Sequence, residues 1–499
     1  MEMTNLNEAE TLLEPHSSTN HLISIFHACK GLFSIPYPFS LAPTMTPKPT
    51  TSKSPIELLP LETQQAILSS LTSIASLKQC ALACPTLYTA YKIAEKVIIA
   101  QVLYNQIGIG VLPEAVLAFS SASLKLSDLE SFSEANFRKR RPPPEVYTFS
   151  DALNMSEMHT RIDFLTKAFV RKALKASPYA SLDESASPAE IDRIERTFYR
   201  FEIYRHIFGR FQQNREWRVQ AQQNMFFKYF SPWENEQLAC VHEFLAQIVI
   251  PVFNEIAAHD VFWGSTNIEP AADASSQYIQ AILSRGLAHI HSIATADSYS
   301  SRRAAMYKLY PPYSDNFFHQ GRNNGHTARA IIASINDSLI QCFFKDSDDG
   351  PEDAWRWAHS KLQSNLPSLM VMTNSFRDYT TARTWGYVMW DRLRLDEWGV
   401  FGKDWRQTLK FASYQELESK RQKEEEIRWE VEASWKRREE LHLAGGFGWW
   451  EETDEGRVEW ARGRPSPWDD VTKRRECELC IGDVRCAPHR LVLRIKDRC

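Results

Sequence analysis

This 499-residue chain has no long hydrophobic run, few glycines and no large excess of charge of either sign. The most apolar stretch, 244–258, is interrupted by polar residues and by Pro251, so we expect no membrane span. The net charge of −4 lacks the basic excess of proteins that bind nucleic acid, and we expect no nucleic-acid partner. Only 18 glycines are present, and the apolar residues recur mainly at helical spacings of three and four.

Cysteines are few, and motifs for chemistry are missing. Nine irregularly spaced cysteines indicate a reducing compartment, so we expect the protein in the cytoplasm, the nucleus or both. No phosphate loop, dinucleotide fingerprint or zincin motif occurs, and His242-Glu243 lacks the second histidine of a zinc protease helix. We therefore expect no enzyme. The open alternative is an enzyme whose catalytic groups come from scattered positions.

What the chain does contain favours a mostly α-helical protein with several parts. Hydrophobic residues make up 43% and aromatic residues 12%, as in a globular protein. No internal period of a repeat protein is visible. The composition shifts along the chain predict five segments: a disordered leader at 1–54, a short three-helix module at 55–92, a helical extension with a basic proline-rich linker at 93–144, a large irregular helical body at 145–443, and a tail containing tryptophan and cysteine at 444–499.

The stretch Leu58–Tyr91 has the most specific pattern. The Leu59-Pro60 step favours an extended residue followed by a helix start. A first short helix carries Ile67 and Leu71, a second is expected to begin with Ser76 as its N-cap, and Pro85 ends that helix before a third. Three such short helices bury little surface alone, so they need a partner or the rest of the chain.

This layout resembles the F-box of filamentous-fungal type, the adaptor-docking module of SCF-type ubiquitin ligases. The match covers Leu59-Pro60, Glu62, Ile67-Leu68, Leu71, Ser76-Leu77, Cys80-Ala81-Leu82, Cys84 and Leu87-Tyr88. Thr63 and Pro85-Thr86 depart from the usual pattern. The resemblance implies docking on the Skp adaptor and its cullin scaffold. It also implies an exposed aliphatic docking face, for which we expect Leu59, Pro60, Ile67, Leu71, Leu77, Leu82 and Leu87.

The body is expected to be helical, with strand in well under a tenth of residues 150–443. Ser187-Pro188 followed by Glu190 marks a helix start. The next helix has an aromatic stripe of Phe198, Phe201, Tyr204, Phe208 and Phe211, which favours a buried core over a binding groove. Pro232 should start a further helix, and Pro251 should kink or end it. Residues 138–144 (RKRRPPP) favour a solvated linker over a nuclear localisation signal.

The tail presents one candidate metal site. Cys477 and Cys480, then Cys486 and His489, form two pairs with the side-chain types that a structural zinc ion needs. Only five residues separate the pairs, so free thiols are the favoured interpretation and we expect no cofactor. The tryptophans nearby (Trp449, Trp450, Trp460 and Trp468) are expected to pack onto the helical body or to form a partner site.

Together these observations predict an intracellular adaptor that binds the Skp adaptor through the F-box-like module and an unknown protein substrate through the body. The alternative is an all-helical scaffold or interaction protein whose F-box-like segment packs within its own chain.

Overall fold

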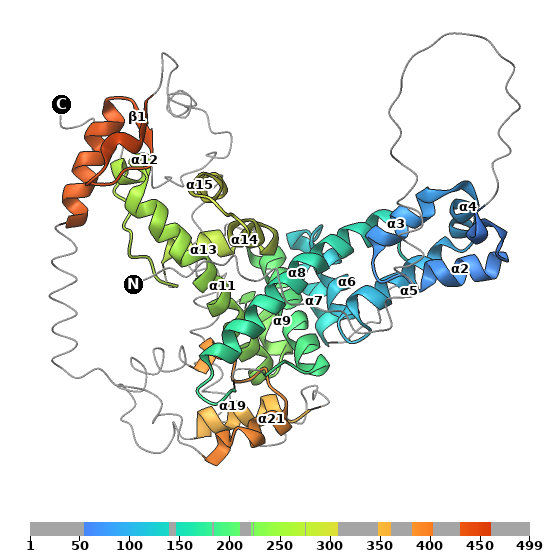
Figure 1. Cartoon of the computed structure of the whole chain (residues 1–499). Helices are drawn as coiled ribbons and strands as arrows, with labels where there is room; N and C mark the ends of the chain where they lie inside the picture. Colours follow the sequence, from blue (N-terminus) through green and yellow to red (C-terminus); the bar gives the residue numbers. More distant parts are fainter. Residues whose placement is uncertain are drawn as a thin grey trace, which may run out of the picture. The chain divides into compact units, whose positions relative to one another are not determined.

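The computed structural model describes nine stretches of the chain, and its element labels follow Figure 1. These stretches are 54–138, 146–181, 184–209, 221–222, 224–274, 276–307, 348–360, 382–402 and 430–460. The chain divides into two compact units, Met1–Leu58 and Leu59–Cys499. In the first unit the described residues form the 3₁₀ turn η2 (Pro55–Leu58), in which Glu57 accepts a hydrogen bond from the Ser54 amide at 2.7 Å. The predicted leader at 1–54 lies outside the described residues except for Ser54.

The second unit begins with helices, as the sequence predicts. The first three are short: α2 (Leu61–Ser69), α3 (Ile74–Ala83) and α4 (Pro85–Ile93). We call residues 59–93 the docking module. Two longer helices follow, α5 (Glu95–Ile107) and α6 (Leu112–Ser121), and then the short elements η3 (Leu126–Asp128), α7 (Leu129–Ser133) and η4 (Glu134–Arg138).

Three long helices form the centre of the body: α8 (Phe149–Ala176), α9 (Pro188–Phe208) and α11 (Pro232–His259). Each begins with a Ser or Thr N-cap in a capping box, where the cap and the third residue satisfy each other's backbone amides. Shorter elements complete this part: η5 (Phe227–Tyr229), α12 (Val261–Ser265), α13 (Gln277–Leu283), α14 (Leu287–Ala294), α15 (Tyr299–Tyr307) and α19 (Gly350–Ser360).

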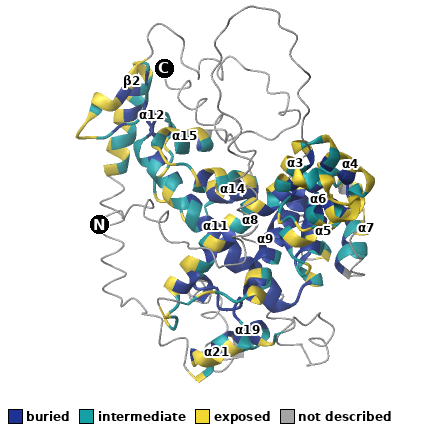
Figure 2. Ribbon diagram, turned by 45° about the vertical axis from the view of Figure 1, so that its right-hand side comes forward, coloured by how far each residue is buried: buried dark blue, intermediate teal, exposed yellow. Residues whose placement is uncertain are grey.

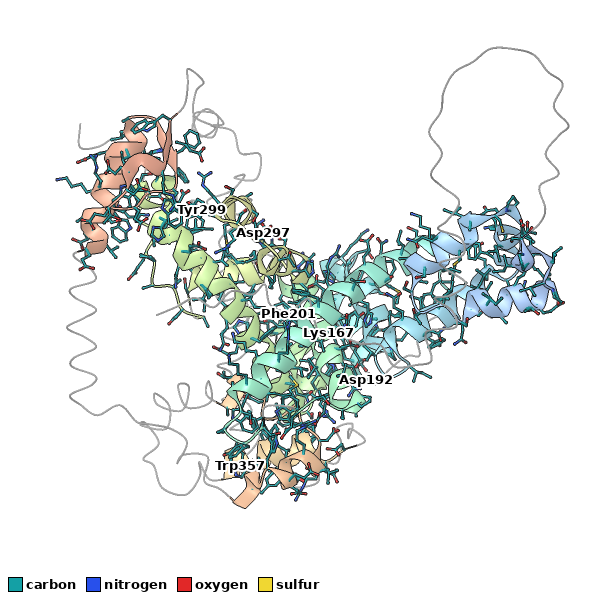
Figure 3. The ribbon with its side chains drawn as sticks, in the orientation of Figure 1. Lys167, Asp192, Phe201, Asp297, Tyr299 and Trp357 are labelled. Atoms are coloured by element: carbon teal, nitrogen blue, oxygen red, sulfur yellow. The ribbon has the colours of Figure 1, made fainter. Side chains whose placement is uncertain are left out.

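Buried aromatic side chains pack between the long helices, whose buried stretches are dark blue in Figure 2. Phe169 of α8 lies edge-on to Phe198 of α9 and Phe244 of α11, with ring centroids 6.4 and 5.2 Å away. Phe201, labelled in Figure 3, is fully buried. The stripe on α9 is therefore core, as predicted, for its first four members, and Phe211 lies outside the described residues.

A segment distant in sequence closes this core. Residues 385–390 are buried, and α21 (Arg392–Glu397) with the turn η6 (Val400–Gly402) follows them. Arg383 donates two hydrogen bonds to Glu236 of α11, at 2.6 and 2.9 Å, and both side chains are buried. Arg394 pairs with Glu190 at the start of α9. Because a buried charge is costly without its partner, these pairs hold the segment in a defined place.

The C-terminal described part, residues 430–460, is a separate small substructure that we call the clasp. It consists of a helix at 430–443, which ends at Gly445 (φ 90°), and a hairpin of β1 (Gly446–Gly448) and β2 (Val458–Trp460), with the turn η8 (Glu455–Arg457) between them. The strands pair antiparallel, with Phe447 opposite Glu459. No other named strand occurs in the described part of the chain, and none lies in its described residues from 150 to 443. The mostly α fold is thus confirmed.

Several boundaries differ from the sequence prediction. α8 starts at Phe149 after a Thr148 cap that the sequence analysis did not single out. Pro251 does not end α11, which continues to His259. Among the described residues α11 is also the one helix long and apolar enough to cross a membrane, and α5 with α6 would pass that test as a bent pair. Most of the α11 window is buried inside the protein.

Candidate docking surface on the N-terminal helices

Local sequence signals determine where the helices of the docking module begin. Pro60 precedes α2 in an extended conformation, and Pro85 occupies the first turn of α4 after extended Cys84. The cap of α3 is Ser73, whose hydroxyl accepts a hydrogen bond from the Ser76 amide at 3.1 Å. The predicted cap, Ser76, is therefore wrong by three residues, since Ser73 is the residue with extended backbone at the helix entrance.

One side of the module is buried against the chain's own helices. The side chains with little or no exposure are Leu68 of α2, Ile74, Leu77 and Ala81 of α3, and Leu87, Ala90 and Tyr91 of α4. All of these except Leu87 belong to the same hydrophobic core as α5, α8 and α9. Tyr91 also lies edge-on to Phe149 of α8, with centroids 6.2 Å apart.

The seven predicted docking residues divide between this buried side and the surface. Leu59, Pro60 and Leu82 are exposed, and Ile67 and Leu71 are half-buried. The expectation that all seven share an exposed face is wrong for Leu77 and Leu87, which are 0% and 4% exposed. Their spacing on α3 and α4 places them toward the core instead. Leu82, at 66% exposed, is on the opposite side of α3 from Leu77.

The structure adds exposed apolar side chains that the sequence pattern did not single out. Leu61 is 38%, Tyr88 47% and Ile93 63% exposed, although each lies in a helix of the module. Together with Leu59, Pro60 and Leu82 we take them as the candidate docking surface. Figure 2 shows exposed stretches, in yellow, on α3 and α4. Large apolar side chains that remain exposed in short, otherwise packed helices are candidates for a protein interface.

Side chains of α5 hold the module in position. Asn105 donates hydrogen bonds to the carbonyls of Ser69 and Leu71, at 2.8 and 3.0 Å, where α2 ends. Gln106 accepts a hydrogen bond from the Ile74 amide, the first residue of α3, at 3.1 Å. Both contacts satisfy backbone groups that a helix end leaves free. Polar residues on α5 gave no signal at the sequence level, because their partners are more than thirty residues away.

A small charged cluster marks the end of α4. Lys92 and Glu95 form an ion pair at 2.5 Å, and the Tyr91 hydroxyl donates to Glu95 at 2.8 Å. These two hydrogen bonds, from Lys92 first and then from Tyr91, lower the pKa of the Glu95 carboxyl. The pair is exposed and its contribution to stability is small. Burial raises the pKa of the Cys80 thiol, which makes it a poor nucleophile.

The remaining candidate residues of the sequence analysis belong to the tail and to α11. The predicted zinc ligands Cys477, Cys480, Cys486 and His489 lie outside the described residues. Within the described ranges no group of three or more His, Cys, Asp or Glu side chains is arranged to hold a metal ion. His242 is buried on α11, within hydrogen-bond distance of Gln280.

Comparison with known proteins identifies no relative: no family model, no curated protein and no solved structure matches the chain.

Proposed function

We propose that the docking module binds the Skp adaptor of an SCF-type ubiquitin ligase, with its cullin scaffold, and that the helical body recruits a protein substrate for ubiquitin transfer. The protein then acts as a non-enzymatic adaptor. The observation that carries the proposal is the division of the F-box-like stretch into a buried side and an exposed apolar side, on three helices in the order that the resemblance implies.

The exposed side chains suit such a contact. Leu59 and Pro60 lie at the entrance of α2, outside the core, and Leu82 lies at the end of α3. Burying an apolar side chain contributes about 25 cal/mol per Å² before the costs of association are subtracted. The buried side needs no partner, because α5 and α8 cover it. Docking would therefore leave the fold of the module unchanged.

The proposal predicts that changing Leu59 and Pro60 together to Ala abolishes co-purification with the Skp adaptor. Both side chains are exposed, so the change should leave helix content and thermal unfolding of the body nearly unaltered. The measurement is a pull-down of purified adaptor by the full chain, with circular dichroism as a check of folding.

Leu393 provides the matched control. It is 71% exposed on α21, remote in sequence from the module, and Leu393→Ala should retain adaptor binding. Undiminished binding by the double variant would refute the docking proposal. A Leu77→Ala change is unsuitable as a test, because Leu77 is in the core and its removal would destabilise the fold.

One observation favours the alternative of an all-helical scaffold. The buried residues of α2 and α3 are continuous with the core of the body, so the module already packs within its own chain. A scaffold of this kind would show no adaptor binding even as the wild-type chain. The same pull-down separates the two functions.

A further inference from the structure

The clasp attaches to the body through an arginine that enters the end of another helix. Arg438 is 1% exposed, and its Nη1 donates hydrogen bonds to the carbonyls of Ala257 and Asp260, at 2.7 and 3.1 Å. The Ala257 carbonyl lies in the last turn of α11, and the Asp260 carbonyl, just past its end, also accepts a hydrogen bond from the Gly264 amide at 2.9 Å. A cation placed there also meets the negative end of the helix dipole. The end of α11 therefore presents two carbonyl oxygens that accept hydrogen bonds from a guanidinium.

A glycine provides the space for this arginine. Gly264 of α12 lies against Arg438, and a Cβ at that position would overlap the guanidinium and the adjoining side-chain carbon. Gly402, by contrast, has nothing within 4 Å of the place where its Cβ would be. The surface of the body is thus shaped to admit a large cationic side chain at Gly264.

Aromatic rings form the second half of the contact. Trp449 stacks on His259 with centroids 4.0 Å apart and an interplanar angle of 9°. Tyr299 of α15, labelled in Figure 3, lies edge-on to the same indole at 4.7 Å. Two polar contacts join His259 and Trp450: the Trp450 amide donates to the His259 carbonyl at 2.6 Å, and the imidazole Nδ1 of His259 lies 3.1 Å from the Trp450 carbonyl.

A buried aspartate, Asp260, also belongs to this part of the body. Asp260 is fully buried and accepts hydrogen bonds from Arg303 at 2.5 Å and from the Tyr299 hydroxyl at 3.2 Å. It also caps α12 through the Trp263 amide. These partners all belong to the body, so Asp260, Tyr299 and Arg303 are held in place without the clasp. We call His259, Asp260, Val261, Gly264 and Tyr299 the receptor surface.

The buried apolar residues of the clasp are not part of the main hydrophobic core of the body. Leu441, Trp450 and Val458 form a small hydrophobic cluster that includes a single residue of the body, Val261, and is separate from the main core. Its buried cation also carries a cost, since burial lowers the pKa of Arg438 to about 10. A contact whose hydrophobic cluster includes one residue of the body, and which holds a desolvated charge, is expected to open reversibly.

We propose that the receptor surface binds a protein segment that carries an arginine and paired tryptophans, and that the clasp occupies it as an intramolecular competitor. A partner segment of this chemistry would place its guanidinium among the carbonyls at the end of α11 and an indole on His259. It binds only when the clasp leaves. The inference uses no residue of the docking module and does not depend on adaptor binding.

The test uses the full chain with a specific protease site inserted after Gly402. After cleavage the piece that carries the clasp is a separate chain beside its own body. Cleaved protein with a fluorophore on the clasp is mixed with an excess of unlabelled cleaved protein. We expect the label to move to unlabelled bodies, measured by energy transfer to an acceptor dye on those bodies, while the circular dichroism of the protein stays constant.

Two results would overturn the proposal. If the label transfers only under conditions that unfold the body, the clasp is an integral part of the fold. If the clasp piece separates and never rebinds, the surface has no affinity for such a segment.

Paired variants locate the interaction. Arg438→Ala should speed dissociation of the clasp piece by at least about tenfold, because it removes the buried hydrogen bonds to the carbonyls. Arg437→Ala is the matched control, since Arg437 is exposed and pairs within the clasp with Glu440 and Glu455. On the body, Gly264→Ala should weaken rebinding and Gly402→Ala should not. Equal rates for Arg438→Ala and Arg437→Ala would also refute the proposal.

Discussion

Glu195 lies on α9 and is 6% exposed, an unusual position for a carboxyl group. Burial first, and then the nearby carboxylates of Asp163 and Asp192, raise its pKa to about 8. Lys167 acts in the opposite direction. Lys167 on α8 and Asp192 on α9 are labelled in Figure 3. The side chain is therefore largely protonated at neutral pH, which removes the cost of a buried charge.

This raised pKa predicts a pH dependence of stability. In the unfolded chain the group has its ordinary pKa of 4.5, so between pH 4.5 and about 8 the folded state binds more protons. The free energy of unfolding should therefore fall as the pH rises through this window and level off above it. Glu195→Gln should reduce this fall and be more stable than wild type at pH 8.5, by a few kcal/mol at most, since each tenfold change in proton affinity corresponds to about 1.4 kcal/mol.

Urea unfolding at several pH values measures the effect. Glu157 of α8 is more than half exposed and pairs only weakly with Arg161 at 3.5 Å, so Glu157→Gln serves as the control and should follow wild type. Parallel curves for wild type and Glu195→Gln would contradict the prediction.

At the scale of single elements, the structure shows which of two serines starts α3. The sequence pattern places the cap at Ser76, but Ser73 has the extended backbone and the capping hydroxyl. Ile74, the first helical residue, is fully buried, and Gln106 satisfies its amide from α5. The helix start is therefore determined by a local cap together with a contact from another element.

The two serines make a direct comparison possible. Ser73→Ala should lower the free energy of unfolding by about 1 kcal/mol, because the Ser76 amide loses its acceptor. Ser76→Ala should have a much smaller effect, since the backbone amide remains and Ala favours a helix interior. Equilibrium urea unfolding of both variants measures the difference, and a larger loss for Ser76→Ala would show that the cap is assigned to the wrong serine.

At the scale of the whole second unit, the main core joins residues from α2 to η6, and the clasp adds a small cluster at the end of α11. The sequence predicts that the tail tryptophans pack on the body or form a partner site, and one of them, Trp468, lies outside the described residues. Trp449 is half-buried and Trp450 is 6% exposed, whereas Trp460 is 53% exposed. The first two hold the clasp to the body, and the third lies largely in solvent.

This arrangement predicts that Trp449→Ala makes the clasp more susceptible to proteolysis. The variant loses the stacking on His259 and the edge contact with Tyr299, so local opening becomes more frequent. Limited proteolysis followed by mass spectrometry should show faster cleavage within 430–460. Trp460→Ala is the matched control and should be cleaved at the wild-type rate. If Trp449→Ala resists the protease as well as wild type does, Trp449 does not hold the clasp to the body.

The sequence alone determined the features that depend on neighbours in the chain. Helical spacing predicted a mostly α protein, Pro232 and Ser187-Pro188 predicted helix starts, and the aromatic stripe of α9 predicted a core face. These signals suffice because propensity, capping and amphipathic period act over a few residues.

Tertiary structure decided which apolar residues are buried and which distant groups meet. Leu77 and Leu82 have similar side chains on the same helix, yet the packing of α3 against α5 and α8 buries only Leu77. Pro251 remains inside α11 because the surrounding core stabilises a helix that local propensity would interrupt. The meeting of Arg438 with the end of α11 joins residues about 180 positions apart. No local pattern encodes such a contact, because it depends on the space at Gly264 and on where the carbonyls at the end of α11 lie.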